Sequence, residues 1–237
     1  AAAGDSVLKV VYFPSCLNQM MGLEKDSPAP APLVEVMTGL CAKAGYQVIF
    51  PERMDSLCCG TIWESKGMPE IADTKVRELE DMLWKASEGG KYPVVCDQSP
   101  CLHRMKKYMT KVKVYESAEF VWLFLKDRLK FTRKDTPVAL HLTCSTKLMK
   151  IDRIVYDLAC LCSSDVLVPE GVGCCGFAGD KGMTHPELNR YALRKLKAQI
   201  DQKGITTGYS NSRTCEMGLR TNSGIPYMSI IYLVDSC

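Results

Sequence analysis

Two stretches of the sequence decide the fold: residues 7–16, which read VLKVVYFPSC, and residues 138–144, which read VALHLTC. Each is an apolar run with the composition of a buried strand, and each ends on a cysteine. A helical pattern and a second, shorter strand pattern follow each run, at 32–44 and 47–50 in the first case and at 152–162 and 165–168 in the second. The chain therefore presents the same order of elements twice.

The repetition continues beyond these strands. In both copies a Cys-Cys-Gly triplet comes next and is followed by the tripeptide Lys-Gly-Met. A charged helical pattern then begins with Pro-Glu. A short apolar run and a last cysteine complete each copy. The helical patterns cover residues 69–86 and 186–203, and the apolar runs cover 93–96 and 205–209. Proline suits the first turn of a helix. This order indicates an internal duplication, and the alternation of strands and helices predicts two α/β halves with mainly parallel sheets.

The duplication predicts two domains, residues 1–130 and 131–237, joined through a polar linker at 130–137. The first copy is longer in one place. Cys16 and Cys58 are 42 positions apart, whereas Cys144 and Cys174 are 30 apart, and the Pro-rich segment 27–32 accounts for the difference as an insertion.

Composition excludes several classes of protein. The chain has 237 residues with 46% hydrophobic and 24% charged residues, which is ordinary for a globular protein. Its net charge of +3, without a basic run interleaved with aromatics, does not favour a nucleic-acid partner. No apolar run is long enough to predict a transmembrane segment. The opening residues lack the features of a signal peptide and would equally suit a cut made inside a longer chain.

Thirteen cysteines are the most informative feature of the composition. Disulfide frameworks belong mainly to small, loop-rich secreted domains, and this chain is long, rich in core residues and has an odd number of cysteines. We therefore expect a cytoplasmic protein whose cysteines bind metal. Any association with a membrane would be made through its partners.

Each copy contains one cysteine, a vicinal pair followed by glycine, and a distant fourth cysteine. The predicted metal ligands are Cys16, Cys58, Cys59 and Cys101 in the first half and Cys144, Cys174, Cys175 and Cys215 in the second. Four thiolates suit an iron–sulfur cluster or Zn²⁺. Free cysteines are often small core residues, but two matching sets favour metal binding over that alternative.

Other residues are candidates for contact with a cofactor. Lys181, His185 and Arg213 lie inside the second-half motifs, and their cationic or hydrogen-bonding groups could stabilise an anionic thiolate centre. For each of them a solvated surface position is the alternative. Cys41 and Cys160 lie in corresponding helical patterns and are expected in the core, whereas Cys96 could substitute for a ligand. His141 occupies the repeat position of Phe13 and is expected in the strand, near the cluster.

The two sets resemble the cysteine-rich CCG domain. That domain is found in one of the subunits of heterodisulfide reductase, in one of those of anaerobic glycerol-3-phosphate dehydrogenase, and in the C-terminal region of FAD-linked D-lactate dehydrogenases. Residues 174–183 (CCGFAGDKGM), 185–188 (HPEL) and 208–216 (GYSNSRTCE) are most similar to the last group. The resemblance implies Rossmann-like halves related by a pseudo-twofold axis. The chain differs from the full motif at Gln98 and Ser212, where the family has a further cysteine.

The resemblance implies the iron–sulfur electron-transfer part of an oxidoreductase, a flavin-dependent D-2-hydroxy-acid (D-lactate-type) dehydrogenase. The expected cofactors are two [4Fe-4S] clusters, one in each half, with FAD only on a partner domain or subunit. The expected acceptor is a quinone, a cytochrome or another electron carrier. The alternative function is a zinc-stabilised interaction module without redox chemistry.

Overall fold

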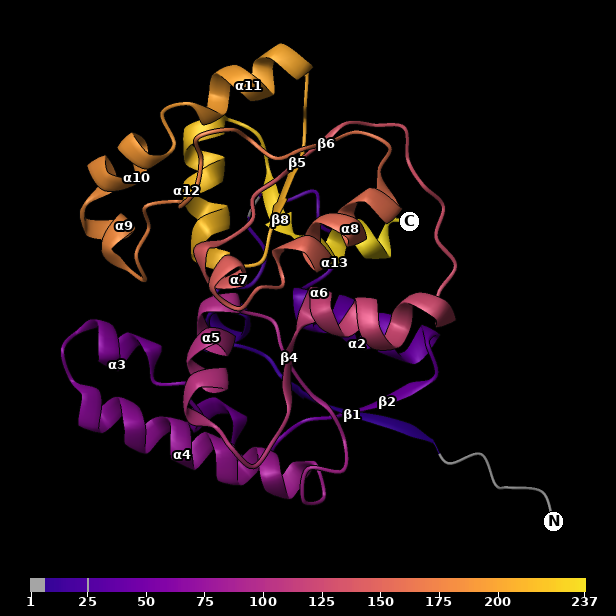
Figure 1. The fold of residues 1–237 in the computed structure, drawn as a ribbon, viewed down its shortest axis with the longest axis vertical. Coiled ribbons are helices and arrows are strands. Elements are labelled where there is room, and N and C mark those ends of the chain that lie inside the picture. The colour runs from indigo at the N-terminus through magenta and orange to yellow at the C-terminus, as the bar shows by residue number, and fades with distance from the viewer. Residues whose placement is uncertain (1–6, 25) are drawn as a thin grey trace.

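The computed structural model describes residues 7–24 and 26–237 and contains two four-stranded parallel sheets (Figure 1). The first sheet consists of β1 (Leu8–Phe13), β2 (Tyr46–Ile49), β3 (Val94–Cys96) and β4 (Val114–Glu116), in the order β2-β1-β3-β4. Its central strands β1 and β3 are almost entirely buried, as their unbroken apolar sequences predict.

The second sheet repeats this topology. It consists of β5 (Val138–Leu140), β6 (Val166–Leu167), β7 (Gly208–Ser210) and β8 (Tyr227–Ser229), in the order β6-β5-β7-β8. The register is also repeated, because Val11 pairs with Val94 in the first sheet and the equivalent Ala139 pairs with Gly208 in the second. The predicted α/β class and the duplicated halves are confirmed, and the division into domains at 130 and 131 stays a prediction.

The helices also correspond between the halves. Those of the first half are α1 (Cys16–Met20), α2 (Leu33–Lys43), α3 (Thr61–Ser65), α4 (Pro69–Ala86), α5 (Ser99–Tyr108) and α6 (Ser117–Phe120), with η1 (Met54–Ser56), η2 (Val121–Leu125) and η3 (Lys126–Arg128). Those of the second half are α7 (Cys144–Leu148), α8 (Asp152–Cys162), α9 (Lys181–Thr184), α10 (Pro186–Ala192), α11 (Leu196–Lys203), α12 (Arg213–Ser223) and α13 (Ile230–Asp235). In both halves helices alternate with the strands, as the sequence pattern predicts.

One long helix of the prediction is interrupted. The pattern at 186–203 forms α10 and α11, with a turn between them, whereas its counterpart α4 is continuous. The Tyr191 carbonyl, which would accept from residue 195 in an unbroken helix, instead accepts from the Arg194 guanidinium at 2.7 Å. The local hydrogen bond from the Leu196 amide goes to Leu193, three residues back. At this point the hydrogen bonds of the α-helix, which span four residues, are therefore interrupted by a bond that spans three, as in a 3₁₀ turn.

A shared apolar core joins the two halves. Helix α2 packs against α13, and α6 packs against α8, so that each half contributes the same pair of helices to the contact. Figure 1 shows these helices between the two sheets. The central core includes Tyr12, Met37 and Phe120 of the first half with Leu158 and Ile231 of the second, all of them fully buried. A separate outer core lies on the far side of each sheet.

No helix in the described part of the chain is both long enough and apolar enough to cross a membrane.

Candidate metal centres

The topology brings the first cysteine of each set to the carboxyl edge of its sheet. Cys16 begins α1 directly after β1, and Cys144 begins α7 directly after β5. The preceding Ser15 and Thr143 cap these helices, since each side-chain oxygen accepts from a backbone amide three residues on. In the first sheet, β3 lies beside β1 and leads into α5, which contains Cys101. In the second sheet, β7 lies beside β5 and leads into α12, which contains Cys215. Ligands collect at this switch point in doubly wound α/β folds.

The vicinal pairs lie at the same edge, and the glycine after each pair allows the backbone to turn there. Gly60 and Gly176 have φ angles of +86° and +72°, in the left-handed region. A Cβ on Gly176 would lie 2.7 Å from the Leu188 carbonyl oxygen, so the chain passes too close to α10 for any side chain. In both halves the glycine amide donates to the sulfur two residues earlier, at 3.3 Å to Cys58 Sγ and 3.3 Å to Cys174 Sγ.

In the first half the four thiols form one connected group. A hydrogen bond with Cys59, together with burial, raises the pKa of Cys58. A hydrogen bond with Cys101 contributes most to the raised pKa of Cys59, and the Cys59 Sγ also lies 3.2 Å from the Thr61 hydroxyl. Burial and then the charge of Cys58 raise the pKa of Cys16. All four predicted ligands of this half therefore influence one another.

The second-half thiols are also connected. Cys175 Sγ lies 2.8 Å from Cys215 Sγ, and both side chains are buried, whereas Cys144 and Cys174 are exposed. Hydrogen bonds from Cys144 and Cys175 lower the pKa of Cys174, and its hydrogen bond with Cys174 raises the pKa of Cys144. The thiols of the second set are therefore linked in a chain from Cys144 through Cys174 and Cys175 to Cys215.

The donor chemistry of both sets fits a cluster or a metal ion. Soft thiolates are the ligands that iron–sulfur clusters and zinc prefer, and amide hydrogen bonds to their sulfurs are the usual means of tuning them. The sulfurs must separate to hold a metal, because sulfurs around zinc are roughly 3.8 Å apart when Zn–S bonds are about 2.3 Å. Accordingly, no three His, Cys, Asp or Glu side chains among the described residues already form an ion-sized site.

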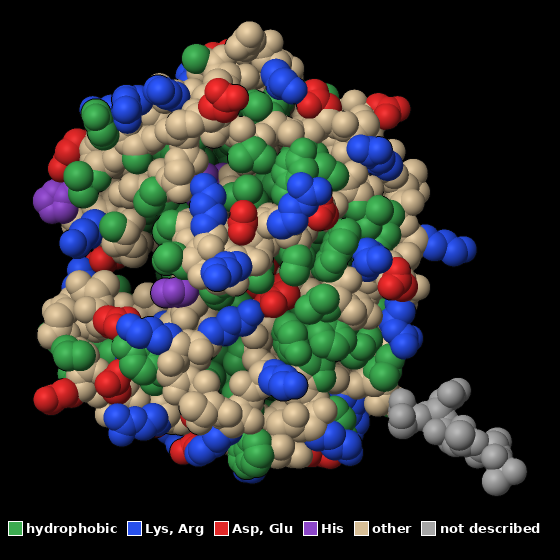
Figure 2. Space-filling view, viewed as in Figure 1, with side chains coloured by type: hydrophobic (Ala, Val, Ile, Leu, Met, Phe, Trp, Pro, Cys, Tyr) green, Lys and Arg blue, Asp and Glu red, His purple; other side chains and the backbone are tan. Residues whose placement is uncertain are grey.

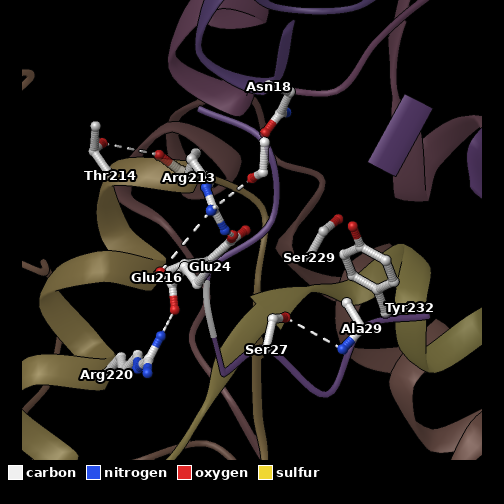
Figure 3. Close-up of polar contacts among 12 residues, drawn as sticks. Asn18, Glu24, Ser27, Ala29, Arg213, Thr214, Glu216, Arg220, Ser229 and Tyr232 are labelled. Carbon is white, nitrogen blue, oxygen red and sulfur yellow. Dashed lines mark hydrogen bonds and ion pairs between the residues drawn. The ribbon is translucent and has the colours of Figure 1, made fainter. Parts of the chain in front are cut away.

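The predicted cofactor contacts lie at different depths. Lys181 and His185 are exposed, and His185 Nδ1 lies 3.2 Å from Glu187 Oε1. Arg213 is largely buried, and its guanidinium donates to the Gly22 carbonyl at 3.1 Å and lies 3.5 Å from Glu216 (Figure 3). Glu24 lies between Arg213 and Arg220 and pairs with both. Their roles toward a cofactor stay predictions.

These contacts hold the loop between α1 and α2, which is longer than its counterpart in the second half. Gly22 and Glu24 precede the predicted insertion and contact α12 of the second half. Figure 3 shows Glu24 beside Arg213 and Arg220. Tyr232 of α13 adds a bond from its hydroxyl to the Ala31 carbonyl at 3.0 Å. The segment that is absent from the second copy therefore connects the two halves.

The surface is hollowed between the two halves. Figure 2 shows a notch at the left edge, between the region of α9 and α10 and the region of α3 and α4 of Figure 1. An ion pair of 2.7 Å between Lys66 and Asp180 joins these two regions. Exposed apolar side chains lie on the same elements, and Met68 and Met183 occupy equivalent repeat positions there.

Sequence reasoning missed a polar seam between the halves. Gln98 Nε2 donates to Ser212 Oγ at 3.1 Å, and Gln98 Oε1 accepts from the Arg213 amide at 2.9 Å. Asn211 donates to the buried Glu116 carboxylate at 3.1 Å. The sequence signal was available, because polar residues at the ends of both third strands occupy equivalent positions.

The cysteines outside the two sets also differ from expectation in one respect. Cys41 lies in the central core as predicted, but Cys160 is only half-buried, because it falls on the outer side of α8, whereas Cys162 falls on the core side. Cys96 is buried in β3, and its sulfur lies 3.9 Å from the Gln98 carbonyl.

Comparison with known protein families gives a match that covers both halves. A family model described as a cysteine-rich domain, CCG, matches residues 10–106 and 138–220 and thus spans both halves. This match indicates an iron–sulfur or other metal-binding module. None of the curated proteins compared with the chain matches it.

Three solved structures align with nearly the whole chain. The aspartate racemase of Picrophilus torridus has a TM-score of 0.42 and 10% identity, over 97% of this chain and 93% of that one. The allantoin racemase of Pseudomonas fluorescens has a TM-score of 0.32 and 10% identity, over 97% and 87%. That of Klebsiella pneumoniae has 0.32 and 14%, over 98% and 85%.

Proposed function

Because the chain belongs to the family of the cysteine-rich CCG domain, we propose that it holds two iron–sulfur clusters, one in each half, and transfers electrons through them. The observation that carries this proposal is the repeated arrangement of four thiols. Each set lies at the carboxyl edge of its own sheet, and in each a glycine amide donates to the first sulfur of the vicinal pair. Cys16, Cys58, Cys59 and Cys101 would hold one cluster, and Cys144, Cys174, Cys175 and Cys215 the other.

Four thiolates in each half favour cubane [4Fe-4S] clusters. The fifth cysteine of the full family motif is replaced by Gln98 and Ser212, and these two side chains bond each other. They are therefore engaged between the halves, which argues against the disulfide-reducing chemistry of the heterodisulfide enzyme. The chain's own contribution is to exclude water from Cys59, Cys101, Cys175 and Cys215 and to donate hydrogen bonds to sulfur.

The proposed physiological role is electron transfer within a flavin-dependent D-2-hydroxy-acid dehydrogenase. The second-half stretches 174–183 and 208–216 support this choice through their resemblance to D-lactate dehydrogenases. Hydride removal from a hydroxy acid needs a flavin, which the partner domain or subunit would supply. Exposed apolar residues beside the notch, among them Met68 and Met183, give such a partner a surface to contact. A quinone, cytochrome or soluble carrier would accept the electrons.

The first experiment determines the metal. The chain is prepared anaerobically with ferrous iron and sulfide, and iron, sulfide and zinc are measured per chain. Two [4Fe-4S] clusters give about eight iron atoms per chain and a brown colour with broad visible absorption. A stable content near one zinc per half, without iron, would establish the zinc-stabilised interaction module instead.

The second experiment determines the role. The cluster-loaded chain is incubated with D-lactate and an artificial electron acceptor, first alone and then with a flavin-containing D-lactate dehydrogenase domain. We expect turnover only with the flavin partner, and bleaching of the visible absorption when the reduced partner is added without acceptor. Turnover by the chain alone would reveal a catalytic site in this chain, and clusters that stay oxidised beside the reduced partner would exclude electron transfer.

A further inference from the structure

His141 lies at the end of the central strand of the second sheet and is 1% exposed. Its backbone amide continues the ladder of the sheet by donating to the Tyr209 carbonyl at 2.9 Å. Three residues later the chain reaches Cys144. The equivalent residue of the first half is Phe13, which is also 1% exposed and packs in the outer core with Cys59 and Cys101. A polar ring thus occupies in one half the place of an apolar ring in the other.

Only one nitrogen of this ring has a partner. Nδ1 lies 3.2 Å from the Ser210 hydroxyl, whereas Nε2 is buried without a hydrogen-bond partner among the described residues. A buried polar nitrogen without a partner is destabilising and therefore calls for an explanation. The ring is neutral, because burial, and next the charge of Lys147, lower the pKa of His141 to about 4. A neutral imidazole has one hydrogen to donate.

The second thiol set lies at the same end of this strand, because Cys144 begins α7 directly after it and is hydrogen-bonded to Cys174. His141 and Cys174 are close enough to influence each other electrostatically. The Ser210 hydroxyl has two acceptors, Nδ1 at 3.2 Å and the His141 carbonyl at 3.4 Å. When it donates to the closer Nδ1, the hydrogen of the ring resides on Nε2. A donor directed at a thiolate or at a sulfide bonded to it would then satisfy the otherwise unpartnered nitrogen.

We propose that His141 donates a hydrogen bond from Nε2 to the sulfur atoms of the second metal centre, and that this bond raises the reduction potential of that centre above that of the first. This inference rests on the proposed function, because it requires clusters in both halves. His141 acts as a positioning residue and not as a ligand, since Cys144, Cys174, Cys175 and Cys215 already supply four thiolates.

Two further differences between the sets act in the same direction, whereas the Thr61 hydroxyl, 3.2 Å from Cys59 Sγ, acts in the opposite one. Reduction adds one negative charge to a centre, and that charge is stabilised by hydrogen-bond donors and by solvent. In the second set the Phe177 amide donates to Cys175 Sγ at 3.4 Å, and Cys174 is exposed. In the first set Cys58 is partly buried, and Phe13 offers no donor. Electrons from a reduced flavin or from dithionite would therefore populate the second centre first.

Reciprocal exchange of the two rings tests the proposal. Redox titrations followed by EPR are performed on the anaerobic, cluster-loaded chain and on its His141→Phe and Phe13→His variants, with signals assigned to a half through their loss in Cys175→Ser. We expect His141→Phe to disfavour reduction of the second centre about tenfold, which is 59 mV for one electron, and to leave the first unchanged. His103→Phe, on α5, is the matched control and should change neither potential. Equal potentials in the wild-type chain would overturn the proposal.

A spectroscopic measurement tests the hydrogen bond from His141 directly, so that the conclusion does not depend on a single variant. The chain has only three histidines, so protein labelled with ¹⁵N-histidine gives few nitrogen signals in pulsed EPR of the reduced second centre. We expect one weak coupling that disappears in His141→Phe. A strong coupling typical of direct iron–nitrogen bonding, or no coupling at all, would overturn the proposal.

If His141→Phe fails to load iron, His141→Gln retains an amide donor of similar reach and should keep most of the potential. Failure of the wild-type chain itself to bind iron would refute the proposed function. Loaded clusters whose potentials do not respond to residue 141 would refute this inference alone.

Discussion

Gln98 and Ser212 occupy equivalent positions in the two halves and are hydrogen-bonded to each other, with 3.1 Å between Gln98 Nε2 and Ser212 Oγ. A residue can meet its own repeat counterpart only near the axis that relates the two copies, so this contact marks the pseudo-twofold axis. The symmetry is not complete, because Gln98 also accepts from the Arg213 amide, whereas Ser212 is too short to return that bond.

Loss of the Gln98 side chain should destabilise the whole chain. Gln98 is 2% exposed and bonds two groups of the other half, so Gln98→Ala leaves buried polar groups without partners. We expect the free energy of unfolding to fall by about 1–3 kcal/mol, with a smaller loss for Ser212→Ala. Urea unfolding of both single variants and of the double variant gives the coupling energy. Strictly additive effects would show that the two side chains do not stabilise each other.

Replacement of a predicted ligand should have a different effect from replacement of a cysteine outside the sets. Cys175→Ser should remove about half of the iron, because Cys175 is a ligand of one of two proposed centres. Cys160→Ser should retain the iron, since Cys160 is half-buried on α8. Because metal binding and folding are coupled, Cys175→Ser should also melt at a lower temperature. Iron analysis and thermal melting measure both effects, and indistinguishable variants would contradict the ligand assignment.

The buried Glu116 should make stability depend on pH. Burial raises the pKa of this carboxyl group from 4.5 to about 7, against several hydrogen bonds that lower it. Between these pH values the unfolded chain loses the proton and the folded chain retains it. Stability is therefore fully present below pH 4.5 and falls by about 3 kcal/mol as the pH rises through 7. Urea unfolding across this range should show a flatter slope for Glu116→Gln, and parallel curves would exclude this carboxyl as the cause.

The two vicinal pairs should depend strongly on the glycine that follows them. Gly176→Ala combines a φ of +72° with a Cβ only 2.7 Å from the Leu188 carbonyl oxygen and 2.8 Å from the Ala192 Cβ. Gly204 has a φ of +61° and open space around it, so Gly204→Ala is a matched control for the backbone conformation alone. We expect a loss of about 1 kcal/mol for the control and a clearly larger loss for Gly176→Ala. Chemical denaturation that ranks the two variants equally would contradict the close approach to α10.

Local patterns in the sequence predicted the regular elements well. The helix expected at 152–162 is α8, Asp152–Cys162, because its apolar spacing and the flanking strands agree. The strand at 7–13 and the two glycine turns were also predictable from residue type. Local patterns fail where a side-chain hydrogen bond competes with those of the helix. The Arg194 guanidinium donates to the Tyr191 carbonyl, which would accept from a backbone amide in a continuous helix over 186–203.

From the sequence, only the membership of the candidate site could be proposed, and the eight thiols stay predicted ligands. Cysteine spacing selected the eight thiols, but their burial and mutual hydrogen bonds depend on how the strands end at the sheet edge. The unpartnered Nε2 of His141 and the contact of Glu24 with Arg220 arise between segments far apart in the chain. Such arrangements depend on the three-dimensional packing of the chain, which a pattern of residue types does not encode.

The shared central core also constrains how this molecule can change over evolutionary time. Helices α2 and α6 cover α13 and α8, so neither copy presents a water-compatible face on its own. A single copy of this unit would expose an apolar face and would need a second copy to cover it. Each cysteine pocket can keep its own character, one with Phe13 and one with His141, whereas substitutions in the four interface helices must compensate one another.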